Sequence, residues 1–566
     1  MKGFSPSSKP IKDKKKTNFN MRELVVKAFN LYQHGKHKES FLLFEKLLEQ
    51  DCKDPNFLSN YAVLLKRKGQ FKKAKNLLKE AIKLYPKRSE AYCNISLILS
   101  IEGNHNEAIN YIKQALLLDP ENSTYLYNYG LFLLRNGQFD IAKDLFSKVI
   151  NIAPDYDEAY AEKALACVEL CEYDEAENLL REAIRINSNS PVYLSNLASV
   201  LNTKGQFFDA GEFAIKAINF KSNHAKPFYI LSSSKSHSSN QTFLDQLFSD
   251  EFERGLSKIN KVDLYFARAN ILHRQSNFKD AAKYLFKANN IKLSIFPSDA
   301  KKYIRVCNKL LDFSNKIEYP ISNNNKCDCI FIVGMPRSGS TLTESIISMN
   351  RYVFDLGESN LLESSFVESM VSQDIKNLYK IKSIYYEKRN RVIGKIKEAN
   401  TITTDKQLYN FAYIPFIVSQ FPGARIIHCI RNPLDNILSI FRAHFAAQSR
   451  YSSSLIDCAE FYSLHDRIMY NYKDRFNNKV YTLDYDLLVQ SPENEIRRMI
   501  DWLGWEWEDI YLSPHLNKRS VNTASNVSVR SPINKKSMGG WKKYKELLLP
   551  AINEFSKSDS YKFLLK

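Results

Sequence analysis

Small and apolar positions recur every 34 residues along the first half of the chain. A repeated slot holds glycine, or cysteine once, at Gly35, Gly69, Gly103, Gly137, Cys171 and Gly205. A small residue follows five positions later, at Ser40, Ala74, Ala108, Ala142, Ala176 and Ala210. Proline follows three slots at a distance of seventeen, at Pro86, Pro120 and Pro154. The pattern predicts pairs of antiparallel helices, because glycine permits the turn, a small residue permits close packing, and proline ends the second helix.

This period resembles that of tetratricopeptide repeats, whose helix pairs stack into a superhelix with a concave surface. Six repeats are predicted over residues 21–224, after a flexible basic arm over residues 1–20. A divergent helical repeat and a connector are predicted over residues 225–325, where Ala281 lies five positions after Ser276. We expect the concave surface to bind a protein or peptide. The alternative is that the repeats only support a second domain.

The 34-residue period disappears before the apolar run CDCIFIVG at residues 327–334. A loop rich in glycine and serine follows this run, and a helical pattern follows the loop. A second apolar run, over residues 425–430, also leads into a turn and a helix. These segments predict an α/β domain with a central parallel sheet over residues 326–566.

The first loop of this domain, GMPRSGST, has the glycine spacing of a phosphate-binding loop. Its backbone N–H groups and the following helix N-terminus favour an oxyanion. The candidate binding residues are Pro336, Arg337, Ser338, Gly339, Ser340 and Thr341. Ser340 replaces the lysine of nucleoside-triphosphate loops, which disfavours an ATPase or a kinase. The loop suits a phosphosulfate, whose transferable group carries less charge and needs no metal; the alternative is an ordinary strand–helix turn.

A second candidate phosphate site lies in the segment IRNPLDNILSIF. Arg431 is expected at the carboxyl end of a strand, where open α/β sheets bind ligands. Ser439 follows eight residues later, a little over two helical turns away. Arginine and serine placed in this way can hold one phosphate through charge-assisted hydrogen bonds, although Arg431 alone is also compatible with a surface ion pair.

Together the two segments resemble the phosphate-binding motifs of sulfotransferases that use 3′-phosphoadenosine-5′-phosphosulfate (PAPS). The first motif of that family holds the 5′-phosphosulfate and the second holds the 3′-phosphate. The chain looks most like protein-tyrosine sulfotransferases and like bacterial sulfotransferases preceded by tetratricopeptide repeats. The resemblance implies an all-α repeat superhelix followed by an α/β sulfotransferase domain, with PAPS as co-substrate and 3′,5′-ADP as product.

The resemblance also implies roles for single residues. Glu358 of LGES matches the family's catalytic general base, and Lys406 of TTDKQLYNF matches a lysine near the transferring group. In the same way Arg337 and Ser525 are implied to stabilise the transition state. The remaining implied nucleotide contacts are Tyr485, Arg530 and Trp541.

Two positions depart from the family pattern. A lysine just before the family's tryptophan is Gly540 here, with two lysines directly after Trp541. A basic residue that some members have four positions after the phosphate-binding serine is Ala443 here, beside Arg442. We therefore make no prediction for these two contacts.

Composition and charge add limits to this interpretation. A formal charge of +19 and a pI near 9.2 suit an anionic partner, although a general bias towards lysine explains them equally well. Nine cysteines show no metal-binding spacing and no disulfide framework, which predicts reduced thiols and a cytoplasmic location. We expect no metal, no nucleic-acid partner and no transmembrane segment.

The sequence therefore predicts a PAPS-dependent sulfotransferase that acts on an acceptor hydroxyl. A protein or peptide tyrosine is favoured, because the repeats offer a surface for a protein partner. One alternative is a carbohydrate or small-molecule hydroxyl. Another is a non-catalytic repeat scaffold with a degenerate nucleotide-binding domain, which the retained motif residues disfavour.

Overall fold

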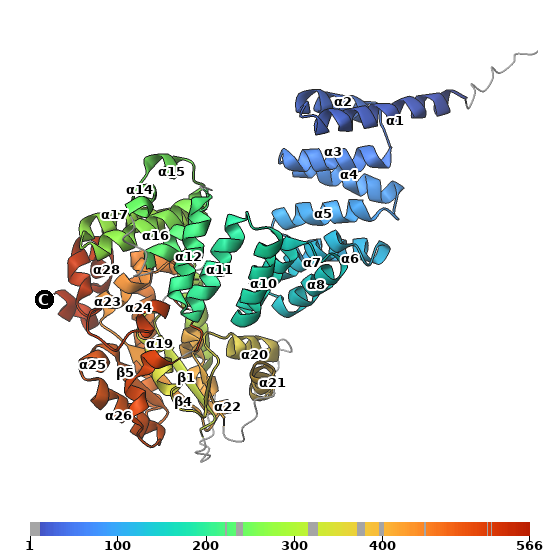
Figure 1. Ribbon diagram of the computed structural model, residues 1–566. Helices are drawn as coiled ribbons and strands as arrows, with labels where there is room; N and C mark the ends of the chain where they lie inside the picture. The colour runs from blue at the N-terminus through green and yellow to red at the C-terminus, as the bar shows by residue number, and fades with distance from the viewer. Residues whose placement is uncertain are drawn as a thin grey trace, which may run out of the picture. The chain divides into compact units, whose positions relative to one another are not determined.

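The computed structural model describes residues 12–220, 223–233, 241–314, 327–370, 380–394, 401–445, 449–517, 519–521, 523 and 525–565 (Figure 1). Contacts divide the chain into two compact units, Met1–Asn189 and Ser190–Lys566. The predicted arm and the other predicted domain limits stay predictions. Helix α1 begins at Lys12, inside the predicted arm, and residues 1–11 lie outside the described part.

The first unit consists of helix pairs. Its helices are α1 (Lys12–Gln33), α2 (His37–Glu49), α3 (Pro55–Arg67), α4 (Phe71–Leu84), α5 (Ser89–Ile101), α6 (His105–Leu118), α7 (Ser123–Arg135), α8 (Phe139–Ile152), α9 (Asp157–Glu169) and α10 (Tyr173–Ile186). The slot residues between the paired helices have positive φ, and Cys171, at 62°, adopts the same turn as the glycines. The small residues five positions later are buried, as close helix packing requires. The predicted helical repeats are thus confirmed.

The second unit opens with further helices, among which the sixth predicted repeat is α11 with α12. These helices are α11 (Pro191–Lys204), α12 (Phe207–Asn219), α13 (Lys226–Ser233), α14 (Gln241–Leu247), α15 (Asp250–Arg254), α16 (Lys258–Arg274), α17 (Phe278–Ile295) and α18 (Ala300–Ser314). The divergent repeat corresponds to α16 and α17, where Ser276 has a φ of 61° and Ala281 is buried.

The rest of this unit contains a five-stranded parallel sheet with the order β2-β3-β1-β4-β5. Its strands are β1 (Cys329–Gly334), β2 (Val353–Asp355), β3 (Ile402–Asp405), β4 (Arg425–Ile430) and β5 (Val480–Asp484). The α-helices that follow β1 are α19 (Ser340–Ile347), α20 (Leu361–Met370), α21 (Ile381–Ile393), α22 (Ile414–Gln420), α23 (Pro433–Arg442), α24 (Leu455–Arg475), α25 (Tyr485–Gln490), α26 (Pro492–Leu503), α27 (Asn526–Val529) and α28 (Lys545–Phe555). The predicted α/β domain is confirmed.

Alternate residues of the central strand β1 enter two different hydrophobic cores, as expected for a sheet covered on both faces. Ile330 and Ile332 pack with residues of α19, α25 and α26. Phe331 and Val333 belong to a larger core that extends from Ala198 on α11 through α24 to α28. The last repeat helices therefore share a core with the sheet.

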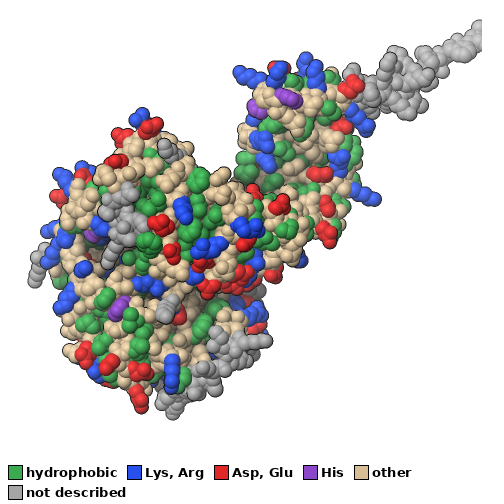
Figure 2. Space-filling model, in the orientation of Figure 1, with side chains coloured by type: hydrophobic (Ala, Val, Ile, Leu, Met, Phe, Trp, Pro, Cys, Tyr) green, Lys and Arg blue, Asp and Glu red, His purple; other side chains and the backbone are tan. Residues whose placement is uncertain are grey.

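Surface and cysteine chemistry give few further constraints. On the face shown in Figure 2, Lys and Arg side chains are interspersed with Asp and Glu. All nine cysteines are free. Among the helices that the structure describes, none has the length and apolar character needed to span a bilayer. The cytoplasmic location stays a prediction.

Candidate functional site

The carboxyl ends of the five parallel strands carry most of the predicted site residues. The phosphate loop follows β1, Glu358 follows β2, and Lys406 follows β3 directly. Arg431 follows β4, and Tyr485 follows β5. Carboxyl ends of parallel strands meet at one edge of a sheet, which is where open α/β folds bind ligands. Residues far apart in sequence therefore come together here.

The phosphate loop joins β1 to the N-terminus of α19. Arg337 has a φ of 69°, a left-handed conformation that is unfavourable for a non-glycine residue. Gly339 caps α19 with a φ of 98°, and a Cβ at this position would lie 2.6 Å from the Tyr485 ring. Ser340 and Thr341 are buried in the first turn of α19. The loop is therefore held tightly, with a helix N-terminus behind it.

Arg337 connects three predicted parts of the site. Its Nε donates to Ser439 Oγ at 3.0 Å, and its Nη1 donates to Ser525 Oγ. Arg431 supports the loop, because its Nη1 donates to the Arg337 carbonyl oxygen at 3.2 Å. The guanidinium carbon of Arg431 also lies 4.7 Å from the centre of the Tyr485 ring, a cation–π contact. Both phosphate motifs thus form one cradle.

The cradle concentrates positive charge. The pKa of Arg337 is lowered to about 10, first by burial and then by the like charges of Arg431 and Arg442. Within the described part of the chain, none of these three guanidiniums forms an ion pair with a carboxylate. Arg431 Nε and Ser338 Oγ are buried without a hydrogen-bond partner in the same part of the chain. Buried cations and unsatisfied donors of this kind suit a polyanionic ligand.

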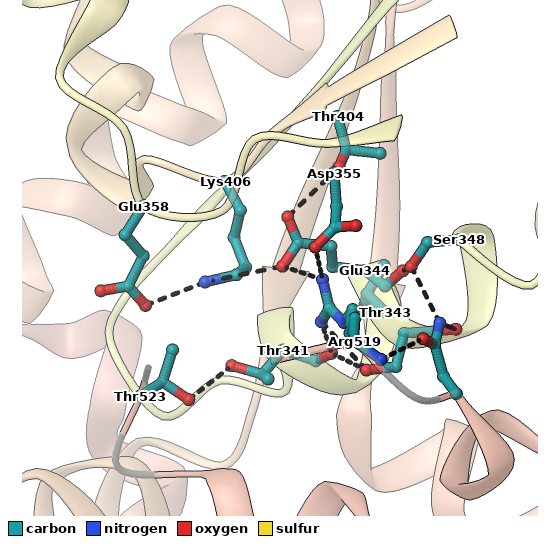
Figure 3. Close-up of polar contacts among 12 residues, drawn as sticks. Thr341, Thr343, Glu344, Ser348, Asp355, Glu358, Thr404, Lys406, Arg519 and Thr523 are labelled. Carbon is teal, nitrogen blue, oxygen red and sulfur yellow. Dashed lines mark hydrogen bonds and ion pairs between the residues drawn. The ribbon is translucent and has the colours of Figure 1, made fainter. Parts of the chain in front are cut away.

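Beside the cradle lies a carboxylate–ammonium pair (Figure 3). Lys406 Nζ donates to Glu358 Oε1 at 2.9 Å, and the Lys406 backbone N–H donates to the Gly357 carbonyl oxygen. Lys406 is buried, whereas the Glu358 side chain is 45% exposed. Burial lowers the pKa of Lys406, but the carboxylates of Glu358 and Glu344 outweigh burial and raise it above its ordinary value.

A buried network behind this pair was not predicted from the sequence. Glu344 on α19 lies 3.7 Å from Lys406 Nζ and 2.7 Å from Arg519 Nη1. Arg519 also pairs with Asp355 at 2.8 Å, and Thr404 donates to Glu344 (Figure 3). Burial raises the pKa of Glu344, but the two cations outweigh it and hold this pKa below its ordinary value. The one available signal in the sequence was an acidic residue in the helix that directly follows the phosphate loop.

Asp435, also not predicted, fixes the C-terminal loop near the second phosphate motif. Its carboxylate accepts hydrogen bonds from the backbone N–H groups of Gly539, at 2.6 Å, and Trp541, at 2.9 Å. Arg431 Nη2 donates to the Ser537 carbonyl oxygen at 2.6 Å. The loop that carries Gly540 and Trp541 is therefore attached to α23, although the Trp541 side chain packs against the hydrophobic core.

The remaining predicted residues differ in their placement. The Pro336 carbonyl oxygen accepts a hydrogen bond from Asn436 of α23 at 2.9 Å, which joins the two motifs. Ala443 caps the C-terminus of α23, and the neighbouring Arg442 supplies charge to the cradle. The structure does not bring Arg530 into the cradle, because its guanidinium donates to the carbonyl oxygens of Thr203 and Arg519.

Comparison with known proteins relates two parts of the chain to known families. Residues 329–509 match the sulfotransferase family, and residues 31–92, 89–122 and 133–200 match tetratricopeptide repeat models. The chain therefore joins segments that match tetratricopeptide repeats to a segment that matches the sulfotransferase family. The matched sulfotransferase segment contains the phosphate loop, Glu358, Lys406 and the second phosphate motif.

Two similar curated proteins match this chain over only part of its length and over only part of their own length. An uncharacterized protein of Aquifex aeolicus is 26% identical over 69% of this chain and 53% of its own length. A protein-tyrosine sulfotransferase of Drosophila melanogaster is 22% identical over 46% of this chain and 56% of its own length. The chain thus spans about half the length of these relatives. A solved tetratricopeptide repeat protein from Parabacteroides merdae is 17% identical, covers 48% of this chain and 93% of that chain, and has a TM-score of 0.35.

Proposed function

We propose that this protein is a PAPS-dependent sulfotransferase that transfers a sulfuryl group to the hydroxyl of a protein or peptide tyrosine. The observation that carries the proposal is that Arg337 and Arg431 meet at the phosphate loop, where Arg431 donates to the Arg337 carbonyl oxygen, and that neither guanidinium forms an ion pair with a carboxylate in the described part of the chain. A nucleotide with separate 5′- and 3′-anionic groups matches this charge. The protein-tyrosine acceptor is favoured by the name of the Drosophila relative and by the repeats.

The cradle residues would hold the donor by its two ends. Arg337, the buried hydroxyl of Ser338 and the N-terminus of α19 fit the 5′-phosphosulfate, because all of them supply donors at one loop. Arg431 and Ser439 fit the 3′-phosphate. Neutralisation by fixed guanidiniums replaces the magnesium ion of phosphoryl-transfer enzymes, so we propose a reaction that needs no metal.

Glu358 is the proposed general base. Its exposed carboxylate takes the proton of the acceptor hydroxyl, and the acceptor oxygen forms a new bond to sulfur. The bond between sulfur and the bridging oxygen breaks, and its electron pair leaves with 3′,5′-ADP. Lys406 changes its contact from Glu358 towards the bridging oxygen as Glu358 becomes neutral. Arg337 and Ser525, already hydrogen-bonded to each other, stabilise charge on the sulfuryl oxygens.

The test has a binding part and a transfer part. In calorimetric titration we expect 3′,5′-ADP to bind more tightly than ATP. The cradle has two positions for anionic groups, and it lacks the lysine with which nucleoside-triphosphate loops bind a triphosphate. Tighter binding of ATP would overturn the donor assignment.

In the transfer part, labelled PAPS is incubated with a tyrosine peptide, with the same peptide carrying phenylalanine, and with an oligosaccharide. Label in the tyrosine peptide alone supports the acceptor assignment. Label in the oligosaccharide alone refutes that assignment but retains the sulfotransferase. EDTA should leave the rate unchanged.

A further inference from the structure

A short C-terminal segment reaches the cradle from one side. We call residues 519–521, 523 and 525–530 the strap. Arg519 pairs with Glu344 and Asp355, and Thr523 Oγ1 lies 3.4 Å from Thr341 Oγ1. Further along, Ser525 accepts the hydrogen bond from Arg337 described above. The strap therefore contacts both the buried network and the phosphate loop.

The other side of the strap is attached to the C-terminal end of α11, the first helix of the sixth predicted repeat. The Val521 backbone N–H donates to the Thr203 carbonyl oxygen at 3.1 Å. Asn526 Nδ2 donates to the Asn202 carbonyl oxygen, and Arg530 Nη2 donates to that of Thr203 at 3.4 Å. The last carbonyl groups of a helix lack partners within the helix and carry partial negative charge. A guanidinium and an amide are suitable partners for them.

Within the strap, Arg530 joins these contacts into one unit. Its Nε donates to Asn526 Oδ1 at 3.1 Å, and its Nη2 also donates to the Arg519 carbonyl oxygen at 2.8 Å. Arg530 forms no ion pair with a carboxylate in the part of the chain that the structure describes. Its Nε and Nη2 thus donate to oxygens of α11 and of the strap itself.

The turn after α11 is shaped for this contact. A Cβ built on Gly205 would lie 2.4 Å from the Arg530 guanidinium carbon, so only glycine leaves room for it. The corresponding slots of earlier repeats, Gly35, Gly69, Gly103 and Gly137, have nothing within 4 Å of such a Cβ. All five have positive φ, which accounts for glycine at the turn in general. Among these five glycines, only Gly205 also leaves space for a side chain from a distant segment, the guanidinium of Arg530.

We propose that Arg530 and Asn526 are positioning residues that fix Ser525 against Arg337 by docking the strap on α11. The sixth predicted repeat is then a structural part of the catalytic centre. The catalytic consequence of this proposal rests on the proposed sulfotransferase activity, whereas docking itself does not. Arg431 and Ser439, the residues proposed for the 3′-phosphate, form none of their hydrogen bonds in the described part of the chain with the strap. Loss of docking should therefore lower turnover and leave donor binding nearly unchanged.

The test compares Gly205→Ala with Gly137→Ala in the full chain. Both variants introduce the same backbone strain at a positive φ, but only the first places a methyl group against Arg530. Hydrogen exchange of the Val521 amide reports docking without any acceptor. We expect exchange to rise about 10- to 100-fold in Gly205→Ala and to stay unchanged in Gly137→Ala. Unchanged exchange in Gly205→Ala would overturn the proposal.

Arg530→Ala and Arg530→Lys supply the kinetic readout. We expect Arg530→Ala to lower kcat by roughly 10²-fold through displacement of Ser525, with 3′,5′-ADP affinity within about threefold of the wild type. Lysine keeps a cation at the helix end and should restore part of both docking and turnover.

Weak 3′,5′-ADP binding with normal Val521 exchange would instead make Arg530 a nucleotide contact and refute the inference. Faster exchange with normal kcat would refute positioning. If wild-type protein shows no transfer, the proposed function fails, and exchange alone decides docking.

Discussion

Replacement of Glu344 by glutamine tests the buried network most directly. The substitution keeps the size of the side chain and removes its charge, which leaves Lys406 and Arg519 with fewer partners. At 3.7 Å from Lys406, the lost attraction is about 4.5 kcal/mol at an effective dielectric constant of about 20. Breaking a buried ion pair by removal of one partner typically costs about 3–5 kcal/mol. We therefore expect Glu344→Gln to lower the free energy of unfolding by about 3–5 kcal/mol.

The assay is denaturant unfolding followed by a probe of the second unit. A matched control is Glu493→Gln on α26, which breaks an exposed pair with Arg497 and should cost less than about 1 kcal/mol. The double variant Glu344→Gln with Arg519→Met should lose less unfolding free energy than the sum of its single variants. Once one partner is removed, the other no longer contributes through their ion pair. Equal effects of the Glu344 and Glu493 substitutions would refute the reasoning.

The difference in unfolding free energy between the wild type and Glu344→Gln should depend on pH in a definite direction. The folded-state pKa of Glu344 is lowered from 4.5, so its contribution is present above that pH and is lost as pH falls through the folded pKa. The stability difference between wild type and Glu344→Gln should therefore shrink below about pH 4.5. A difference that stays constant down to pH 3 would show that the charge of Glu344 does not contribute.

Three further predictions concern the cradle and the shared core. Glu358→Ala should reduce transfer by about 10²–10⁴-fold and leave 3′,5′-ADP binding nearly intact in titration; equal loss of both would exclude Glu358 as the base. Arg431→Ala should weaken 3′,5′-ADP far more than adenosine 5′-phosphosulfate, which lacks the 3′-phosphate, and an unchanged preference would remove Arg431 from the 3′ position. A fragment of residues 326–566 should lack a cooperative unfolding transition, because the core of Phe331 and Val333 continues into α11–α17; a cooperative transition would show that the fragment folds without those helices.

Much of the fold could be predicted because its signals are local. A turn that requires positive φ and a small residue at a close helix contact are each encoded at one position, so the 34-residue period identified the helix pairs. The turn at Cys171 follows the same rule without glycine. The motifs at the strand ends are equally local. The residue that follows a parallel strand lies at the carboxyl edge of the sheet, which is where open α/β folds bind ligands.

The supporting contacts could not be predicted because they join distant segments. Glu344 and Arg519 are 175 positions apart, and neither belongs to a motif whose spacing identifies the other. Asp435 acts through backbone N–H groups of a loop more than one hundred residues later. Arg530 was assigned to the nucleotide by resemblance, whereas the structure places it on the end of α11. Only tertiary packing determines such pairs.

The buried network and the cradle differ in how their cations are compensated, and this difference affects ligand binding. Lys406 and Arg519 both pair with the buried carboxylate of Glu344, which fixes their positions before any ligand arrives. Arg337 instead sits in an unfavourable backbone conformation, buried beside like charges. Such a cradle is costly to the free protein and gains stability when an anion binds, because the ligand supplies the missing counter-charge. Saturation with 3′,5′-ADP at about 100 times its Kd should therefore stabilise the second unit by about 2.7 kcal/mol through binding linkage.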